Sequence, residues 1–185
     1  KRHAGSDEFH PWDVTFYTEK VKNEKFNLSE EELRPYFRLE QVVAGVFEHA
    51  TRLYGIRFQE RKDIPVYHPD VKAYEVNDED GSFLGVFFAD FFPRESKKGG
   101  AWMTNYLEQG TWGGKKVRPH VSIVCNFTKP TASQPSLLTL MEVKTLFHEF
   151  GHALHSLLTD CRYASLSGTN VYWDFVELPS QVMEN

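Results

Sequence analysis

The sequence has little cysteine, and this excludes two kinds of stabilisation. Of its 185 residues only Cys125 and Cys161 are cysteines, which is too few for a disulfide framework. Neither belongs to a C-x-x-C pair of the kind that holds structural zinc. Cys125 stands in an apolar pattern typical of a strand, where a buried free thiol is the usual occupant. We therefore expect both cysteines to be free.

Blocks of one charge and long apolar runs are also missing. The 26 acidic and 21 basic residues give a net charge of −5 without clustering, whereas a nucleic-acid face or a membrane-surface patch needs grouped Lys and Arg. No apolar run approaches the roughly 18 residues of a membrane span, and residues 1–6 do not lead into the apolar core of a signal peptide. We expect a soluble protein without nucleic-acid or membrane partners, in the cytoplasm rather than the periplasm.

The chain does contain enough apolar material for a core. Hydrophobic residues make up 41% of it and aromatic residues 15%, which excludes global disorder. It begins without Met, and its last residues, 183–185, lie within a pattern that is still helical. We expect residues 1–185 to be part of a single domain that is cut at both ends from a longer chain.

The N-terminal part of the sequence predicts two helices. Ser29, with Glu32 three residues later, forms a capping box that opens a short helix, and Pro35 ends it. Apolar residues at helical spacing then predict a longer helix over 42–54, which Gly55 is well placed to terminate.

Short β-rich runs follow these helices. Residues 71–76 and 83–88 predict two strands, and the polar segment 77–81 between them predicts a hairpin. Residues 93–119 are rich in Gly and Lys, which predicts a long mobile loop, interrupted by a helical turn near 102–107.

The C-terminal part predicts one more strand and two helices. Apolar and polar residues alternate over 121–127, in a strand that is either an ordinary member of the sheet or an exposed edge able to pair with an extended peptide. Helical spacing predicts a helix over 137–158 and, after a loop over 160–169, a second helix over 171–185 that faces it. The expected fold class is α+β.

The predicted helix over 137–158 contains the H-E-x-x-H run His148-Glu149-Phe150-Gly151-His152. At 3.6 residues per turn the two histidines share one face about 6 Å apart, so both imidazoles reach a single Zn²⁺ at about 2.0–2.1 Å. Glu149 is turned by about 100° and flanks the ion, where it can take a proton from water that the metal activates. The run predicts a zinc site with a general base.

Glu177, on the second predicted helix, is the candidate third ligand, because a helix, loop, helix return would bring its carboxylate to the two histidines. Two histidines and one carboxylate leave a fourth position open, which is typical of catalytic zinc, whereas structural zinc prefers a closed shell rich in thiolate. The H-E-x-x-H pattern also occurs by chance, so a helical scaffold with coincidental histidines stays an alternative.

Neighbouring residues are weaker candidates. His155 lies about 10.5 Å along the helix from His148, too far for one ion to span, and we expect it to be packed or at the solvent edge. Asp174 either accepts the free ring N–H of His148 or His152 and orients it, or favours the start of its own helix. Gly151 costs about 1 kcal/mol relative to Ala inside a helix, so we expect a close contact that requires its missing Cβ.

Several segments together resemble the thimet oligopeptidase family of zinc metallopeptidases. They are the H-E-x-x-H run continued through 153–155, and residues 98–102, 124–128, 166–170 and 174–181. Within that family, 166–170 is most similar to bacterial peptidyl-dipeptidases, whereas 177–181 also suits oligopeptidase A.

The resemblance implies that His148, His152 and Glu177 bind one Zn²⁺ per chain and that Glu149 polarises the water. It implies a mainly helical, zincin-like, two-lobed enzyme with a deep channel, a monomer that acts on short, unstructured peptides. The family stabilises the oxyanion with a Tyr- and His-containing segment well beyond the third ligand. No such segment follows Glu177 here, so we expect this chain alone to be inactive.

The most specific functional expectation is a peptidyl-dipeptidase, which removes C-terminal dipeptides. The alternative is an oligopeptidase A-like endopeptidase, because the sequence does not show how the channel treats a substrate carboxylate. A second alternative, for this chain alone, is a zinc-binding module without activity.

Overall fold

The computed structural model describes residues 9–26 and 30–185, and it has the α+β class that the sequence predicts. In chain order the elements are α1 (Asp13–Phe26), α2 (Glu30–Leu33), the 3-10 helix η1 (Arg34–Tyr36), α3 (Leu39–Tyr54), β1 (Arg57–Glu60), β2 (Lys72–Asn77), β3 (Phe83–Asp90), β4 (Trp102–Leu107), β5 (Gly110–Trp112), β6 (Lys115–Val117), β7 (His120–Val124), α4 (Leu140–Leu157), the 3-10 helix η2 (Ala164–Leu166), α5 (Trp173–Val176) and α6 (Leu178–Glu184).

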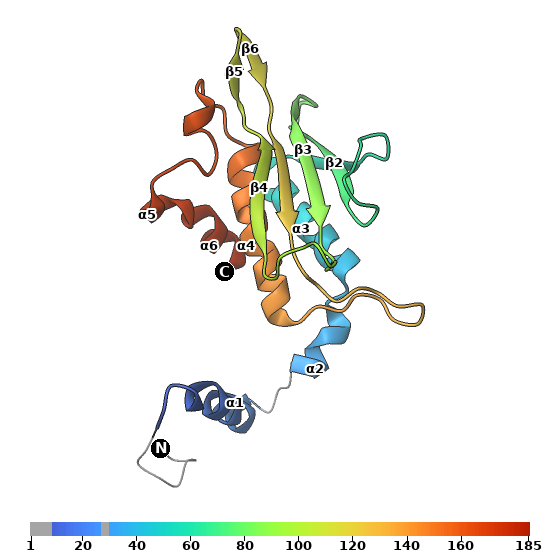
Figure 1. Cartoon of the computed structure of the whole chain (residues 1–185), viewed down its shortest axis with the longest axis vertical. Helices are drawn as coiled ribbons and strands as arrows, with labels where there is room; N and C mark the ends of the chain where they lie inside the picture. The colour runs from blue at the N-terminus through green and yellow to red at the C-terminus, as the bar shows by residue number, and fades with distance from the viewer. Residues whose placement is uncertain (1–8, 27–29) are drawn as a thin grey trace.

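The centre of the fold is a five-stranded mixed sheet in the order β1-β2-β3-β7-β4 (Figure 1). Neighbouring strands pair antiparallel except β3 and β7, which are parallel. The predicted hairpin is confirmed as β2 and β3. Because β7 lies between β3 and β4, the interpretation of 121–127 as an exposed edge is wrong, and the edge on that side is β4.

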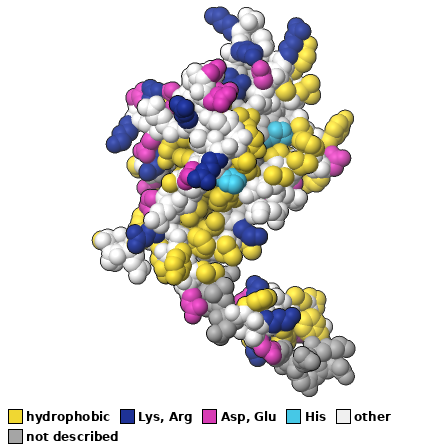
Figure 2. Space-filling view, turned by 180° about the vertical axis from the view of Figure 1, so that it is seen from behind, with side chains coloured by type: hydrophobic (Ala, Val, Ile, Leu, Met, Phe, Trp, Pro, Cys, Tyr) yellow, Lys and Arg dark blue, Asp and Glu magenta, His cyan; other side chains and the backbone are white. Residues whose placement is uncertain are grey.

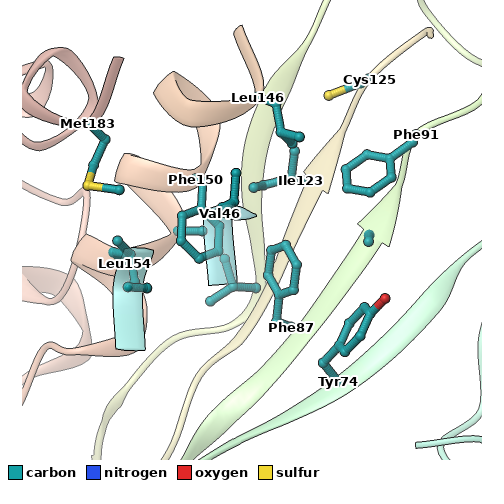
Figure 3. Close-up of a cluster of buried hydrophobic side chains, with 14 of the residues drawn as sticks. Val46, Tyr74, Phe87, Phe91, Ile123, Cys125, Leu146, Phe150, Leu154 and Met183 are labelled. Atoms are coloured by element: carbon teal, nitrogen blue, oxygen red, sulfur yellow. The ribbon is translucent and has the colours of Figure 1, made fainter. Parts of the chain in front are cut away.

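Helices α3 and α4 cover one face of this sheet, and the main core lies between the two layers. Figure 3 shows Phe87 of β3 and Ile123 of β7 directed toward Phe150 of α4 and Val46 of α3. All four side chains are almost completely buried, and each such burial stabilises the fold by about 1.5–3 kcal/mol. This layer fixes α4, the helix with the H-E-x-x-H run, against the sheet.

Hydrogen bonds fix both ends of α4, which confirms the helix predicted over 137–158. At its start the Thr139 hydroxyl accepts from the Glu142 N–H while the Glu142 carboxylate accepts from the Thr139 N–H, a capping box that the sequence analysis missed. At its end Arg118 donates to the carbonyls of Leu157 and Thr159 and to one carbonyl of β3. Carbonyls that a helix leaves free are thereby satisfied.

Residues 93–119 do not form the long loop with a helical turn that their Gly and Lys content predicts. Residues 102–107 are the strand β4, and β5 and β6 form a hairpin that turns at Gly113 and Gly114. The prediction was wrong because β4 pairs with β7 across the intervening β5–β6 hairpin, and a half-buried edge strand has only a weak alternation of its own.

The single helix predicted over 171–185 is also wrong, because the structure breaks it into α5 and α6 at Glu177. Pro179 stands in the first turn of α6, where it has no N–H to continue a preceding helix. The break places Glu177 at the joint between the two helices.

The N-terminal helices agree with the sequence in part. Helix α3 ends as predicted at Gly55, whose φ of 75° is the left-handed conformation that glycine favours. The short helix α2 ends before Pro35, which lies in η1, and Ser29, its predicted N-cap, lies outside the described residues. Helix α1, which the sequence analysis did not predict, buries none of its residues and lies at one end of the molecule, apart from the sheet (Figure 1).

Both cysteines are free, as predicted. Cys125 is fully buried in the core, and burial raises the pKa of its thiol, which makes it unreactive. In the part of the chain that the structure describes, every helix is too short or too polar to span a membrane.

Candidate metal centre

Helix α4 presents both histidines of the H-E-x-x-H run on one face, which is the geometry that their spacing predicts. The rings of His148 and His152 are in edge-to-face contact, with centroids 5.0 Å apart and an interplanar angle of 85°. Both Nε2 atoms face the Glu177 carboxylate. One turn of helix therefore directs two imidazole nitrogens at one point.

Glu177 completes a group of three donors. Its Oε2 atom lies 3.2 Å from His148 Nε2 and 3.1 Å from His152 Nε2. Ligands that bind zinc tetrahedrally at about 2.0–2.1 Å are about 3.3 Å apart, so the donor set fits such an ion. Among residues 9–26 and 30–185 this is the one cluster of three or more His, Cys, Asp or Glu donors, all within 4.8 Å of one another.

A close contact between α4 and α6 brings Glu177 to the histidines. A Cβ at Gly151 would lie 2.5 Å from the Pro179 carbonyl oxygen and 2.6 Å from Ser180 Cα, which are impossible distances. Only glycine lets the start of α6 approach α4 this far. This is the contact that the mid-helix glycine predicts, and its partner is the segment that follows Glu177.

The surroundings favour the metal-binding form of two of the donors. A hydrogen bond from the Ser180 hydroxyl, 2.7 Å from Glu177 Oε2, lowers the pKa of Glu177, and the two histidines lower it further. Burial lowers the pKa of His152, although Glu177 acts in the opposite direction. Glu177 is thus ionised and His152 neutral near pH 7, the states in which each residue binds a cation.

A second carboxylate holds the ring of His148. Glu184 Oε2 lies 2.9 Å from His148 Nδ1, so this nitrogen carries the ring hydrogen and donates a hydrogen bond to Glu184 when Nε2 is directed at the donor cluster. Asp174 does not take this position, and His152 Nδ1 has no hydrogen-bond partner among the described residues. The sequence analysis missed Glu184, although it follows Glu177 by seven residues, a spacing that returns to the same face of a helix.

Glu149 lines the same cavity as the three donors, and its side chain is only 9% exposed. Burial raises the pKa of Glu149, and the negative charge of Glu177 raises it further. His148 and a hydrogen bond from the backbone N–H of Met103 act in the opposite direction. A carboxyl group with a raised pKa is suited to accept and return a proton near neutral pH.

A cavity of 340 Å³ opens beside the donors. Besides the donors and Glu149 it is lined by two groups of residues, Ala101, Trp102 and Met103 on the β4 side, and Thr169, Trp173 and Val176 near α5. Figure 1 shows α4 between β4 and the α5–α6 pair. An ion held here would be reachable from the cavity, as catalytic zinc is. The β4 wall was missed because its residues were expected to form a loop interrupted by a helical turn.

His155 is packed and takes no part in the donor cluster, as the sequence predicts. Its ring contacts Phe175 edge-on, with centroids 6.1 Å apart. It also lines a separate apolar groove of 340 Å³ together with Tyr54, Leu178 and Val182.

The matching family model and three similar proteins agree on one protein family. Residues 1–185 match the model of Peptidase family M3. Dipeptidyl carboxypeptidase of Escherichia coli is 54% identical over 176 residues, which cover 95% of this chain and 26% of that protein. Oligopeptidase A of Escherichia coli is 47% identical over 187 residues, 100% of this chain and 28% of that protein. A thimet-like oligopeptidase of Dictyostelium discoideum is 36% identical over 189 residues, 96% of this chain and 27% of that protein. The chain thus spans about a quarter of the length of these curated relatives.

Proposed function

Since the chain belongs to Peptidase family M3, we propose that it is the metal-binding part of a single catalytic domain, in a zinc-dependent, zincin-like peptide hydrolase. The observation that carries the proposal is the convergence of His148 Nε2, His152 Nε2 and Glu177 Oε2 next to the buried Glu149. Two imidazoles and one carboxylate beside an open cavity suit one Zn²⁺ per chain.

The chemistry divides between the ion and the residues around it. Bound zinc would polarise the scissile carbonyl and lower the pKa of water. Glu149 takes the proton from the attacking water and passes it to the leaving amine, and burial raises its pKa toward the range in which both steps proceed. Ser180 keeps Glu177 ionised and Glu184 holds the His148 ring, so both donors stay aimed at one point.

The position of β4 supports an extended peptide as the substrate. β4 ends the sheet, so its outer backbone edge has no strand partner among the described residues. A peptide can pair with such an edge as an additional strand, and Trp102 and Met103 would then guide it past the donors. This binding mode requires an unfolded segment, and we propose short, unstructured peptides as substrates.

The finer proposal is a dipeptidyl carboxypeptidase, because the relative of that name is 54% identical, against 47% for oligopeptidase A. The two activities differ in whether a free C-terminal carboxylate is required. Mass spectrometry of products from one peptide with a free C-terminus and one with an amidated C-terminus separates them. Dipeptide release that amidation abolishes supports the carboxypeptidase, and equal internal cleavage of both peptides supports an endopeptidase.

Glu149→Gln in the full-length protein tests the proposed reaction. We expect the variant to keep one zinc per chain while kcat falls by about 10²–10⁴, because the general base is lost. Glu60→Gln on the exposed strand β1 is the matched control and should cleave normally. Normal cleavage by zinc-loaded Glu149→Gln would refute the role of Glu149. Zinc binding without cleavage by the unmodified full-length protein would favour a noncatalytic zinc module.

A further inference from the structure

A buried charged cluster holds the chain just before β4. Asp90, at the end of β3, is fully buried and accepts hydrogen bonds from both terminal nitrogens of Arg94, at 2.8 and 2.9 Å, and from Lys97 Nζ at 2.9 Å. Tyr67 donates to the same carboxylate at 3.0 Å. The side chain of Lys97 is 2% exposed and also donates to the carbonyls of Asp90 and Phe92, so its three N–H donors are all used.

A second contact holds the next three residues. The Asn126 side-chain amide, just after β7, donates to the carbonyls of Lys98 and Gly100, both at 2.8 Å. Gly100 has a φ of 90°, so the chain turns there in a conformation that glycine favours. Residues 101–103 follow immediately and form the β4 wall of the metal cavity. We call Asp90, Lys97 and Asn126 the strand clamp.

The clamp fixes geometry more than it adds stability. A buried ion pair is a weak net stabiliser, because the loss of hydration offsets most of its attraction. What it determines is where the segment 97–100 lies, since Lys97 ties it to the end of β3 and Asn126 ties it to the end of β7. β4 itself is half-buried and pairs on one side only, with β7, so the clamp sets the point at which the chain enters the strand.

We propose that the strand clamp positions the outer edge of β4 for peptide binding, which makes Lys97 and Asn126 positioning residues. The inference rests on the proposed function, because the peptide is the one that β4 would bind there. The metal donors come from α4 and from the joint between α5 and α6. A shift of β4 therefore weakens peptide binding and leaves the metal site intact.

Asn126→Ala in the full-length, zinc-loaded protein is the direct test. It removes both hydrogen bonds from a partly exposed side chain, so the fold is retained. The probe is an unstructured nonapeptide, with its Kd measured by calorimetry in parallel with kcat and KM. We expect Kd and KM to rise about tenfold, with kcat within about twofold and zinc affinity unchanged. Lys97→Met should give the same split, and Asn126→Asp, which has no N–H to donate, at least the same rise.

Val76→Ala is the control for a general loss of stability. Val76 is fully buried in β2, which β3 and β7 separate from β4, and its truncation should leave Kd, KM and kcat unchanged at temperatures where the protein is folded. Wild-type Kd and KM in Asn126→Ala and Lys97→Met would overturn the inference, and so would an equal rise in Val76→Ala. If the unmodified protein bound the peptide without cleaving it, and the clamp variants bound it with a higher Kd, the result would support the clamp and refute the proposed reaction.

Discussion

At His148, two carboxylates meet one imidazole ring, with Glu177 at Nε2 and Glu184 at Nδ1. The Nε2 atom of His152 faces the same Glu177 oxygen, so the Nε2 side is the donor side and the proton of His148 belongs on Nδ1. A carboxylate at that position fixes the tautomer and the ring orientation and makes the other nitrogen a better ligand.

Glu184→Ala should therefore weaken zinc binding by about 10- to 100-fold, because the ring of His148 loses the acceptor that orients it. Competition with a chelator of known affinity measures the change. Asp174→Ala is the comparison, since the sequence made Asp174 one candidate for this role, whereas in the structure Glu184 contacts the His148 ring. A larger loss in Asp174→Ala than in Glu184→Ala would contradict the assignment.

Asp90 also links one residue to a property of the whole protein, its stability in acid. Burial acts to raise the pKa of Asp90, but hydrogen bonds from Arg94 and Lys97 outweigh it and hold the pKa below its ordinary value of 3.8. The unfolded chain therefore takes up the proton first as the pH falls. The stability that Asp90 contributes is complete above pH 3.8 and is lost as the pH falls toward the pKa of the folded state.

Asp90→Asn should lower the free energy of unfolding by about 3–5 kcal/mol at neutral pH, because Lys97 stays buried without its counter-charge, and should flatten the dependence below pH 4. Denaturant titrations from pH 7 to pH 2 measure both effects. The pKa of Asp63 is also lowered, to about 2, but its partner is Arg61 on the surface, so Asp63→Asn should change little. If the free energy of unfolding of Asp90→Asn fell below pH 4 as steeply as that of the unmodified protein, the role of Asp90 in acid stability would be contradicted.

At the scale of elements, the close approach of α6 to α4 at Gly151 places the third donor, Glu177, beside the two histidines. Alanine in a helix is ordinarily better than glycine by about 1 kcal/mol. At Gly151 the new Cβ would meet backbone atoms at 2.5 and 2.6 Å, and overpacking of this kind costs about 1–3 kcal/mol or more. The clash outweighs the helix propensity, so α6 must move and carry Glu177 with it.

Gly151→Ala is expected to lower the free energy of unfolding and the zinc affinity together. Gly45→Ala in α3 is the matched control, because its Cβ would have nothing within 4 Å, and it should stabilise the protein by about 0.5–1 kcal/mol. Thermal unfolding and chelator competition on both variants measure the difference. A stabilised Gly151→Ala that binds zinc normally would show that α6 does not depend on this glycine.

Local patterns predicted the elements that they determine locally. The helical spacing before Gly55 and through the H-E-x-x-H run, and the hairpin of β2 and β3, could be predicted because neighbours in sequence specify them. β4 could not, since the β5–β6 hairpin separates it from its partner β7 and its Gly- and Lys-rich surroundings resemble a loop. The break at Glu177 could have been predicted from Pro179, which is unfavourable inside a helix.

At the scale of the whole molecule, much apolar surface is exposed. Seen from behind, hydrophobic side chains gather across the middle of the molecule (Figure 2). Tyr172 and Trp173 are each 90% exposed, and Leu178 and Val182 of the groove beside His155 are exposed as well. Surfaces of this kind usually pack against other protein. The exposure agrees with the proposal that residues 1–185 are one part of a catalytic domain, since the chain spans about a quarter of its relatives' length.

More of the candidate site than of the fold could be predicted from the sequence. The sequence named the three donors and Glu149, and the structure brings the three donors to one point. The resemblance included residues 98–102 and 124–128, but the sequence did not show that they form the β4 wall and part of the strand clamp, because both depend on the order of strands in the sheet. Spacing along a helix is a local property, whereas the residues that surround a site are set by the packing of distant segments.

Diffraction from zinc-loaded crystals at the zinc absorption edge is the most direct measurement. We expect one anomalous peak per chain, about 2.0–2.1 Å from His148 Nε2, His152 Nε2 and a Glu177 oxygen, and no peak in Glu177→Ala crystals grown with the same zinc. A peak at another group of residues, or zinc held by the two histidines with Glu177 out of bonding reach, would contradict the proposed metal centre.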